Sequence, residues 1–199
     1  MGMDPFYYAR LIDNPPLNHW PLVRRGQLTI SRLMNQILQK IPFRQDYQPG
    51  LQGFFCGNEL WQQDVADWIK GDRVVNDIRD RGCEVWLYTT GQSDVIGYGS
   101  LGVSEWRVPT KGPKIRVNTI PYLGIDQRYW GQPPGPREYR FSTQVIEHLT
   151  IEASRHHDRS PFLGLFVHRD NSGAIKLYER LHFDHFRDSG EYIVMLRSL

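Results

Sequence analysis

Hydrophobic residues recur along this chain at two different spacings, and each spacing predicts one kind of element. Apolar positions every third or fourth residue predict helices over residues 58–69, 72–80, 141–153 and 172–181. Alternating or unbroken apolar runs predict strands over residues 83–90, 95–103, 115–125, 162–167, 183–187 and 192–196. Helices and strands are interspersed, so the pattern predicts a mixed α+β fold with a sheet flanked by helices.

Individual residues predict where some of these helices and strands begin, end or break. Asn58 is the expected N-cap of the first helix, and Gly82 is the expected end of the second. Gly91 and Asp94 fall between the first two strands and predict a hairpin turn. Pro121 lies inside the third strand and has no N–H to donate to a neighbouring strand, so we expect a bulge or a local strand separation there.

Residues 1–50 are predicted to be an extension that precedes the main elements. Its hydrophobic residues follow a helical stripe that stops at Pro42: Ile30, Leu33, Met34, Ile37, Leu38 and Ile41. This stripe predicts an amphipathic helix. We favour packing of the helix on its own domain; packing against a partner chain, as in a homodimer, stays open.

Length and composition exclude several classes of protein. With 199 residues, 40% of them hydrophobic, the chain can form one domain spanning residues 1–199. Its net charge of +2 argues against a histone-like nucleic-acid binder. The longest apolar runs are far below the ~20 residues that span a bilayer, and the N-terminus shows no secretory signal. We therefore expect a cytoplasmic protein with no membrane partner.

Three motifs suggest chemistry that their surroundings do not support. Residues 97–102 spell GxGxxG, yet no helical period follows, so we expect glycines inside a strand where another backbone comes close. His148 and the pair at 156–157 lack the spacing of a zinc site, and no metal is expected. Cys56 and Cys83 cannot build a disulfide scaffold and are interpreted as buried thiols.

A strand–loop–helix unit in the C-terminal part of the chain has the character of an anion site. The strand over residues 120–125 runs into residues 126–132 and then into a helix. Backbone N–H groups of such a loop, together with the positive end of the helix, can bind a pyrophosphate. Arg128, Arg137 and Arg140 make the loop locally cationic.

A second such unit is more specific. The apolar strand over residues 163–167 is followed by Asn171, Ala174, Tyr178 and Phe183. Over roughly residues 83–199, this arrangement resembles the GNAT superfamily of acyl-CoA-dependent N-acetyltransferases. The Phe-Cys-Gly segment at 55–57 and the helix after it are similar to a branch that includes toxins acetylating aminoacyl-tRNA. The resemblance implies an α+β fold with a mostly antiparallel sheet of six to seven strands and an extra N-terminal helical segment.

The resemblance also implies where acetyl-CoA binds. Its pantetheine arm would lie in a V-shaped opening between the third strand and the strand over residues 163–167, facing the backbone amides of Leu123 and Ile125. One of these N–H groups would stabilise the negative charge that builds up when an amine attacks the thioester. Asn171 would hydrogen-bond the pantetheine arm, and Tyr178 would protonate the departing thiolate. Tyr178 also fits a plain core position of its helix.

The pyrophosphate of acetyl-CoA would rest on the amides of Trp130, Gly131 and Gln132. Where the family has a further amide donor, this sequence has Pro133, which has no N–H. Arg137 or Arg140 would substitute as a charged donor, although both also fit a solvated role. N–H groups at the start of the following helix, near residues 142–143, are the other candidates.

Two further positions bear on the resemblance. His182 stands where the family has a glycine, and histidine tolerates a left-handed backbone better than most residues. No carboxylate occupies an obvious general-base position; Asp126 and Glu105 are the nearest in sequence, and each is interpreted as structural.

These features predict an N-acetyltransferase that transfers an acetyl group from acetyl-CoA to a primary amine by direct attack, without a metal. Two alternatives stay open. One is a non-catalytic GNAT-fold module that binds CoA. The other is a toxin-type enzyme acting on aminoacyl-tRNA, for which nucleic acid would be a partner. The sequence does not identify the amine acceptor.

Overall fold

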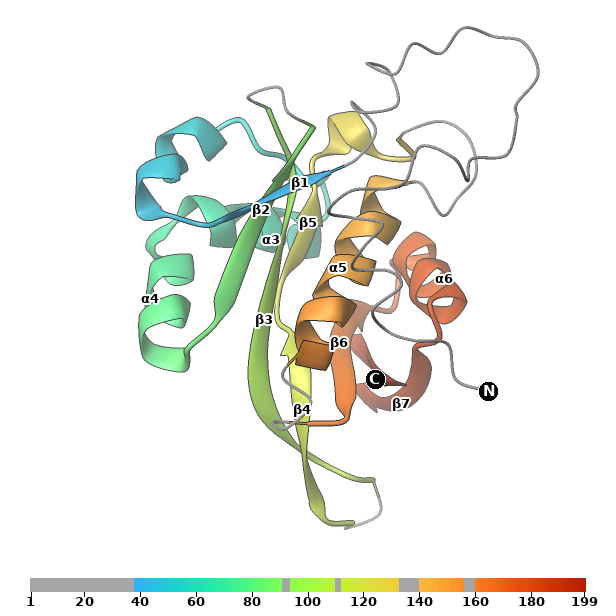
Figure 1. The fold of residues 1–199 in the computed structure, drawn as a ribbon. Coiled ribbons are helices and arrows are strands. Elements are labelled where there is room, and N and C mark those ends of the chain that lie inside the picture. The colour runs from blue at the N-terminus through green and yellow to red at the C-terminus, as the bar shows by residue number, and fades with distance from the viewer. Residues whose placement is uncertain (1–37, 91–93, 110–111, 133–139, 156–159) are drawn as a thin grey trace, which may run out of the picture.

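A computed structural model describes residues 38–90, 94–109, 112–132, 140–155 and 160–199. Within these ranges the core element is one eight-stranded sheet with the order β1-β2-β3-β4-β6-β8-β7, and β5 pairs with β3 beyond the end of β4 (Figure 1). The strands are β1 (Gln39–Pro42), β2 (Glu84–Thr89), β3 (Val95–Arg107), β4 (Lys114–Ile120), β5 (Leu123–Ile125), β6 (Phe162–His168), β7 (Asp184–Ser189) and β8 (Tyr192–Ser198).

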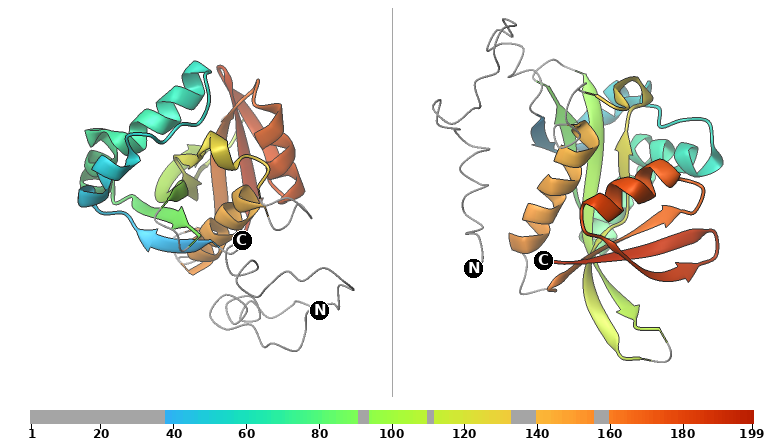
Figure 2. Two further views of the ribbon diagram at one scale, coloured as in Figure 1. Left: turned by 90° about the horizontal axis from the view of Figure 1, so that it is seen from above. Right: turned by 90° about the vertical axis from the view of Figure 1, so that its right-hand side faces the viewer.

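Helices cover both faces of this sheet, with α3 and α4 on one face and α5 and α6 on the other (Figure 2). Successive side chains of β2 show the division, because Val85 joins the core beneath α3 and α4 whereas Trp86 joins the core beneath α5. The helices are α3 (Leu60–Lys70), α4 (Asp72–Arg81), α5 (Phe141–Arg155) and α6 (Ser172–Arg180), with short 3-10 helices η1 (Gln45–Leu51) and η2 (Gln127–Tyr129).

The predicted fold class is confirmed: the sheet is mixed, and β4 with β6 is the parallel pair in an otherwise antiparallel set of described strands. The predicted helices and the C-terminal strands are present with boundaries shifted by a few residues. Gly82 ends α4 in a left-handed conformation, as expected, and His182 is also left-handed with a φ of 64°.

Three predictions from the sequence were wrong in detail. The amphipathic helix does not extend to Ile41, because residues 39–42 form β1 and pair with β2; residues 30–37 lie outside the described part. The N-cap of α3 is Glu59 rather than Asn58, since Glu59 and Gln62 form a reciprocal capping box. With β1 added, and with the third predicted strand divided at its proline into β4 and β5, the described sheet has eight strands instead of six to seven.

Pro121 produces the predicted irregularity. On β3, the four residues from Gly102 back to Gly99 face a partner segment of five residues, from Thr119 to Leu123. One extra residue is therefore inserted at the proline. This bulge separates β4 from β5 and directs the chain after Pro121 away from β6, the parallel partner of β4.

The GxGxxG motif lies inside β3, as predicted. A side chain at Gly97 would place its Cβ 2.7 Å from the carbonyl oxygen of Gly124 in β5. The glycine is there because two backbones come close, and no helix follows that could hold a dinucleotide.

Candidate active site

The parallel pair β4 and β6 separates at its end. These strands are paired from Asn118 with Leu163 to Ile120 with Leu165, and the pairing stops there. Beyond this point β5 pairs with β3, while β6 stays paired with β8, its partner along its whole length. A gap thus opens in the middle of the sheet, at the place where the GNAT resemblance implies a V-shaped opening.

The ladder between β3 and β5 determines where the backbone of β5 points. Its flanking hydrogen bonds run from Ser100 N to Tyr122 O (3.0 Å) and from Asp126 N to Ile96 O (2.8 Å). Hydrogen-bonded pairs alternate with non-bonded pairs in an antiparallel ladder, so the bonded pair between them is Tyr98 with Gly124. The N–H groups of Leu123 and Ile125 therefore point away from β3 and into the gap.

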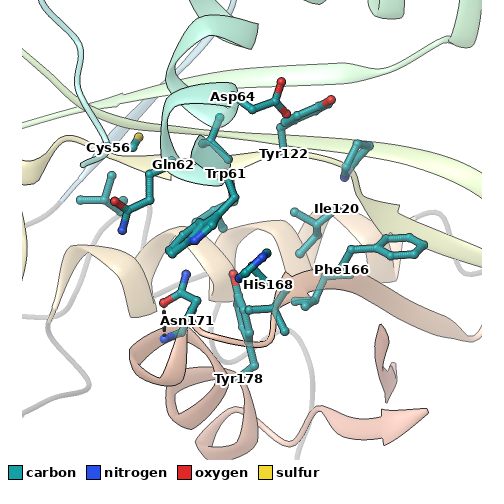
Figure 3. A pocket seen from close by; sticks show the side chains of 18 of the residues that line it. Cys56, Trp61, Gln62, Asp64, Ile120, Tyr122, Phe166, His168, Asn171 and Tyr178 are labelled. Atoms are coloured by element: carbon teal, nitrogen blue, oxygen red, sulfur yellow. Dashed lines mark hydrogen bonds between the residues drawn. The ribbon is translucent and has the colours of Figure 1, made fainter. Parts of the chain in front are cut away.

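A cavity of about 790 Å³ occupies the gap and extends onto the α3 side of the sheet. Of the predicted ligand residues, those that line it are Leu123, Ile125, Trp130, Gly131 and Asn171, together with Tyr178. Arg128, Gln132 and Arg140 are not among its lining residues in the described structure, and Arg137 lies outside the described residues. The figure of the site shows side chains from α3, β6 and α6 converging on this space (Figure 3).

Tyr178 extends from α6 into the cavity (Figure 3). Its ring packs edge-on against Phe183, and burial raises the pKa of its hydroxyl to about 12. Within the described residues the hydroxyl has no hydrogen-bond partner. A buried phenol that keeps its proton at neutral pH and faces open space is equipped to donate that proton.

Asn171 is the N-cap of α6. Its Oδ1 accepts a hydrogen bond from Ala174 N at 3.1 Å, which leaves the amide NH₂ to face the cavity (Figure 3). Capping the helix and binding a ligand are thus compatible for this side chain.

The loop after β5 offers fewer amides than the resemblance implies. Trp130 N already donates to Gln127 O (3.2 Å), and Gln132 N donates to Tyr129 O (3.1 Å). Gly131, left-handed with a φ of 71°, has no such partner among the described residues and lines the cavity. Trp130 instead closes the end of β5, because its Nε1 donates to Ile125 O at 2.9 Å.

The start of α5 supplies a further donor beside this loop. Ser142 lines the cavity, and its N–H belongs to the first helical turn, where intrahelical partners are lacking. Arg140, just before the helix, has a buried Nε without a partner in the described part of the chain. One loop amide, a helix start and the gap in the sheet thus fit a phosphopantetheine group.

The buried Asp126 organises the loop. Its carboxylate accepts hydrogen bonds from Arg128 N (3.0 Å), from Phe55 N (3.3 Å) and from the Arg128 guanidinium. Burial alone would raise the pKa of Asp126, but these hydrogen bonds outweigh it and lower the pKa. As predicted, Asp126 is structural. Glu105 is also remote from the cavity, paired with Lys114 at 2.9 Å.

Sequence reasoning missed an aromatic wall on the α3 side. Trp61 of α3 stacks on His168 of β6 with ring centroids 5.5 Å apart and planes 9° apart. Tyr192 of β8 meets the same imidazole edge-on at 5.5 Å. All three line the cavity, as does the half-exposed Phe166. No local sequence motif indicates this wall, because its residues come from three separate elements.

Other candidate groups have structural roles. Cys56 and Cys83 are free and buried, as expected. His148 bonds Tyr88 and Glu152 within the protein, and residues 156–157 lie outside the described part. The described residues contain no group of three or more His, Cys, Asp or Glu side chains arranged to hold a metal. They also contain no helix long and apolar enough to cross a membrane.

Comparison with solved structures identifies the architecture as the GNAT-type N-acetyltransferase fold, so the resemblance noted from the sequence is confirmed for the fold. Comparisons with models of protein families and with curated protein sequences find no match.

Three similar structures illustrate the fold. A tyrosine-to-phenylalanine mutant of the toxin AtaT, bound to acetyl-CoA and the C-terminus of the antitoxin AtaR, is 21% identical, with a TM-score of 0.58 over 81% of this chain and 92% of that chain. AtaT with acetyl-methionyl-tRNA is 19% identical, with a TM-score of 0.57 over 80% and 94%. The PaiA N-acetyltransferase of Thermoplasma acidophilum with coenzyme A is 13% identical, with a TM-score of 0.57 over 82% and 99%.

Proposed function

We propose that the protein is an N-acetyltransferase that transfers the acetyl group of acetyl-CoA directly to a primary amine. The observation that carries the proposal is the gap beyond Ile120 and Leu165, into which the N–H groups of Leu123 and Ile125 point beside the hydroxyl of Tyr178. Two proteins of similar fold bind the proposed co-substrate or its product: AtaT is seen with acetyl-CoA, and PaiA is seen with coenzyme A.

The gap supports the addition step. The amine nitrogen would attack the thioester carbon, and the carbonyl oxygen would gain negative charge. A main-chain N–H of Leu123 or Ile125 that is already fixed by the β3 ladder would stabilise this charge without reorganising. Asn171 and the start of α6 would hold the pantetheine arm on the opposite side of the gap.

Tyr178 supports the elimination step. When the carbon–sulfur bond breaks, the sulfur keeps the electron pair and would take the proton of the Tyr178 hydroxyl. The ammonium formed on the acceptor loses its proton to water, and the Tyr178 phenolate regains a proton from water, which restores the enzyme. Burial also raises the thiol pKa of Cys56, which lines the same cavity, to about 12. Burial in this cavity disfavours the charged form of a thiol, so a proton donor beside the departing sulfur would assist its release.

Calorimetry and a thiol-release assay test the proposal together. We expect acetyl-CoA to bind with a dissociation constant below the millimolar range, and free CoA to appear when a suitable amine is added. Absence of binding at millimolar acetyl-CoA would remove the proposal. Tight binding with no thiol release for every amine offered would favour a non-catalytic CoA-binding module, which the reduced set of loop amides also suggests.

A second candidate activity is acetylation of aminoacyl-tRNA. It is supported by the likeness to AtaT, whose structure was determined with acetyl-methionyl-tRNA. Transfer of labelled acetyl groups to charged tRNA, with an affinity that falls steeply as salt rises, would support this activity.

We also propose a homodimer, which light scattering would test. The two free thiols fit the cytoplasmic location that we propose.

A further inference from the structure

The α3 side of the cavity ends in a cluster that we call the aromatic box: Trp61, His168 and Tyr192. The imidazole contacts both the stacked indole and the edge-on phenol, so the three rings form one continuous cluster. The box lines the same cavity as Tyr178, the residue proposed to act on the leaving thiolate, and Figure 3 shows Trp61 and His168 from it. An acceptor that enters the cavity on this side would contact the box.

Carboxylates surround the aromatic box. Asp170 Oδ2 lies 3.7 Å from His168 Nδ1, and Glu191 Oε2 lies 3.9 Å from His168 Nε2. The two carboxylate side chains are 81% and 84% exposed, so both can meet a ligand. Glu59 lines a smaller hollow beside Trp61 together with Asp170. In the described part of the chain, none of these three carboxylates pairs with a lysine or an arginine.

Two arginines on this side of the sheet are, by contrast, already paired with carboxylates. Arg73 pairs with Asp64 at 2.6 Å, and Arg81 pairs with Asp77 at 3.3 Å. Asp64, Asp77 and Arg81 all line the cavity. Three carboxylates, Asp170, Glu191 and Glu59, thus lie around the aromatic box against one neighbouring arginine, Arg169.

We propose that the acceptor is an aliphatic diamine or polyamine, whose second ammonium group binds at the aromatic box and its carboxylates while the first reacts beside Tyr178. This inference rests on the proposed acetyltransferase function and narrows its substrate. An ammonium group is attracted to the face of an indole or phenol and to carboxylates, and Trp61, Tyr192, Asp170 and Glu191 provide both at one end of the cavity. A monoamine would leave this end without a partner.

The same charges disfavour a polyanionic acceptor. Binding of nucleic acid depends on lysine and arginine side chains that neutralise phosphates. Around the box, Asp170, Glu191 and Glu59 outnumber Arg169, whose Nη2 donates to Gly190 O at 2.6 Å and lies 3.9 Å from Asp188. Charged tRNA would bring its phosphates against carboxylates.

Competing acceptors of matched length test the proposal. Release of CoA would be followed with 1,4-diaminobutane, with spermidine and with n-butylamine, at low salt and at 0.5 M salt. We expect kcat/KM for the diamine to exceed that for n-butylamine about tenfold at low salt. High salt should reduce this ratio several-fold, because the second ammonium group is bound by exposed charges.

Charge-neutral variants test whether Asp170 and Glu191 bind the second ammonium group. The double variant Asp170→Asn with Glu191→Gln should lower kcat/KM about fivefold for the diamine and leave that for n-butylamine unchanged. The matched control is Glu105→Gln, which removes an exposed carboxylate on the distant β3–β4 hairpin and should alter neither value.

Three outcomes would overturn the inference. Equal use of n-butylamine and the diamine would show that no second charge is recognised. Acetylation of charged tRNA, with no turnover of the diamines, would assign the acceptor site to nucleic acid while leaving the acetyltransferase function in place. Failure of acetyl-CoA to bind would contradict the inference and the proposed function together.

Discussion

Asp126 and Arg128 form a closed pair in which one buried carboxylate binds the guanidinium through Nε at 2.9 Å and Nη2 at 3.1 Å. The carboxylate is 1% exposed, whereas most of the arginine side chain faces solvent. Asp126 also accepts a hydrogen bond from Phe55 N, and Gln127 N donates to Phe55 O at 2.7 Å. The loop proposed to bind phosphate is therefore tied to the segment that leads into α3.

Removing the Asp126 carboxylate is expected to loosen this connection. Asp126→Ala leaves the donors of Phe55 and Arg128 without their acceptor, and we expect a loss of about 2 kcal/mol in the free energy of unfolding. Affinity for acetyl-CoA should fall as well, because Gly131 follows directly on the loop that Asp126 orders. Urea unfolding and calorimetry measure the two effects. As a control, Asp46→Ala removes an exposed partner of Arg44 and should change neither measurably.

Gly97 is expected to be essential for the position of β5. An alanine there would place its Cβ 2.7 Å from Gly124 O and 2.7 Å from Ile125 Cδ1, so β5 must move. We expect Gly97→Ala to cost about 1–3 kcal/mol of stability and to weaken binding of acetyl-CoA. Gly102→Ala, in the same strand, is the matched control. Its Cβ would meet no atom closer than 3.9 Å, and a comparable loss in that variant would refute the explanation.

Features that depend on local stereochemistry could be predicted from the sequence. The break at Pro121 follows from the missing N–H of proline, and the placement of Gly97 inside a strand follows from the lack of helical spacing after it. Tyr178 and Asn171 were found because both belong to one continuous motif, and both line the cavity.

Features that depend on contacts between distant segments could not be predicted. Ile41 is the last residue of a helical stripe that stops at Pro42, yet residues 39–42 form a strand by pairing with β2, because the partner strand decides the conformation of so short a segment. The aromatic box likewise joins α3, β6 and β8, and only the folded sheet brings their side chains together. Amides of Trp130 and Gln132 are used within their own turn, which the family pattern does not reveal.

Tyr178→Phe is expected to slow acetyl transfer without weakening the binding of acetyl-CoA. The variant keeps the ring that packs against Phe183 and loses only the proton donor. We expect kcat to fall by about 10²–10⁴-fold while the dissociation constant of acetyl-CoA stays within about twofold. Tyr47→Phe removes a hydroxyl in η1, far from the cavity, and should leave kcat unchanged. Undiminished turnover by Tyr178→Phe would mean that another group protonates the thiolate.

A buried polar network between β2 and α5 is expected to make the protein sensitive to mild acid. His148 Nδ1 meets the Tyr88 hydroxyl at 2.6 Å, its Nε2 meets Glu152 at 3.0 Å, and Glu152 also binds Lys40 and Arg155 at 2.7 Å each. Burial, and then the positive charge of Lys40, lower the pKa of His148 to about 4 against the opposing effect of Glu152. The folded protein therefore holds this imidazole neutral.

The sign of the effect follows from proton uptake. As the pH falls below 6.5, His148 in the unfolded chain gains a proton that the folded chain does not accept until about pH 4, so unfolding is favoured. The stabilisation that comes with a neutral His148 is fully present above pH 6.5. It decreases as the pH falls towards 4, by ~3 kcal/mol in total. Urea unfolding of the wild type at pH 7, 6 and 5 should show this decline, and His148→Gln should flatten it. An equally steep decline in the variant would place the acid sensitivity in another group.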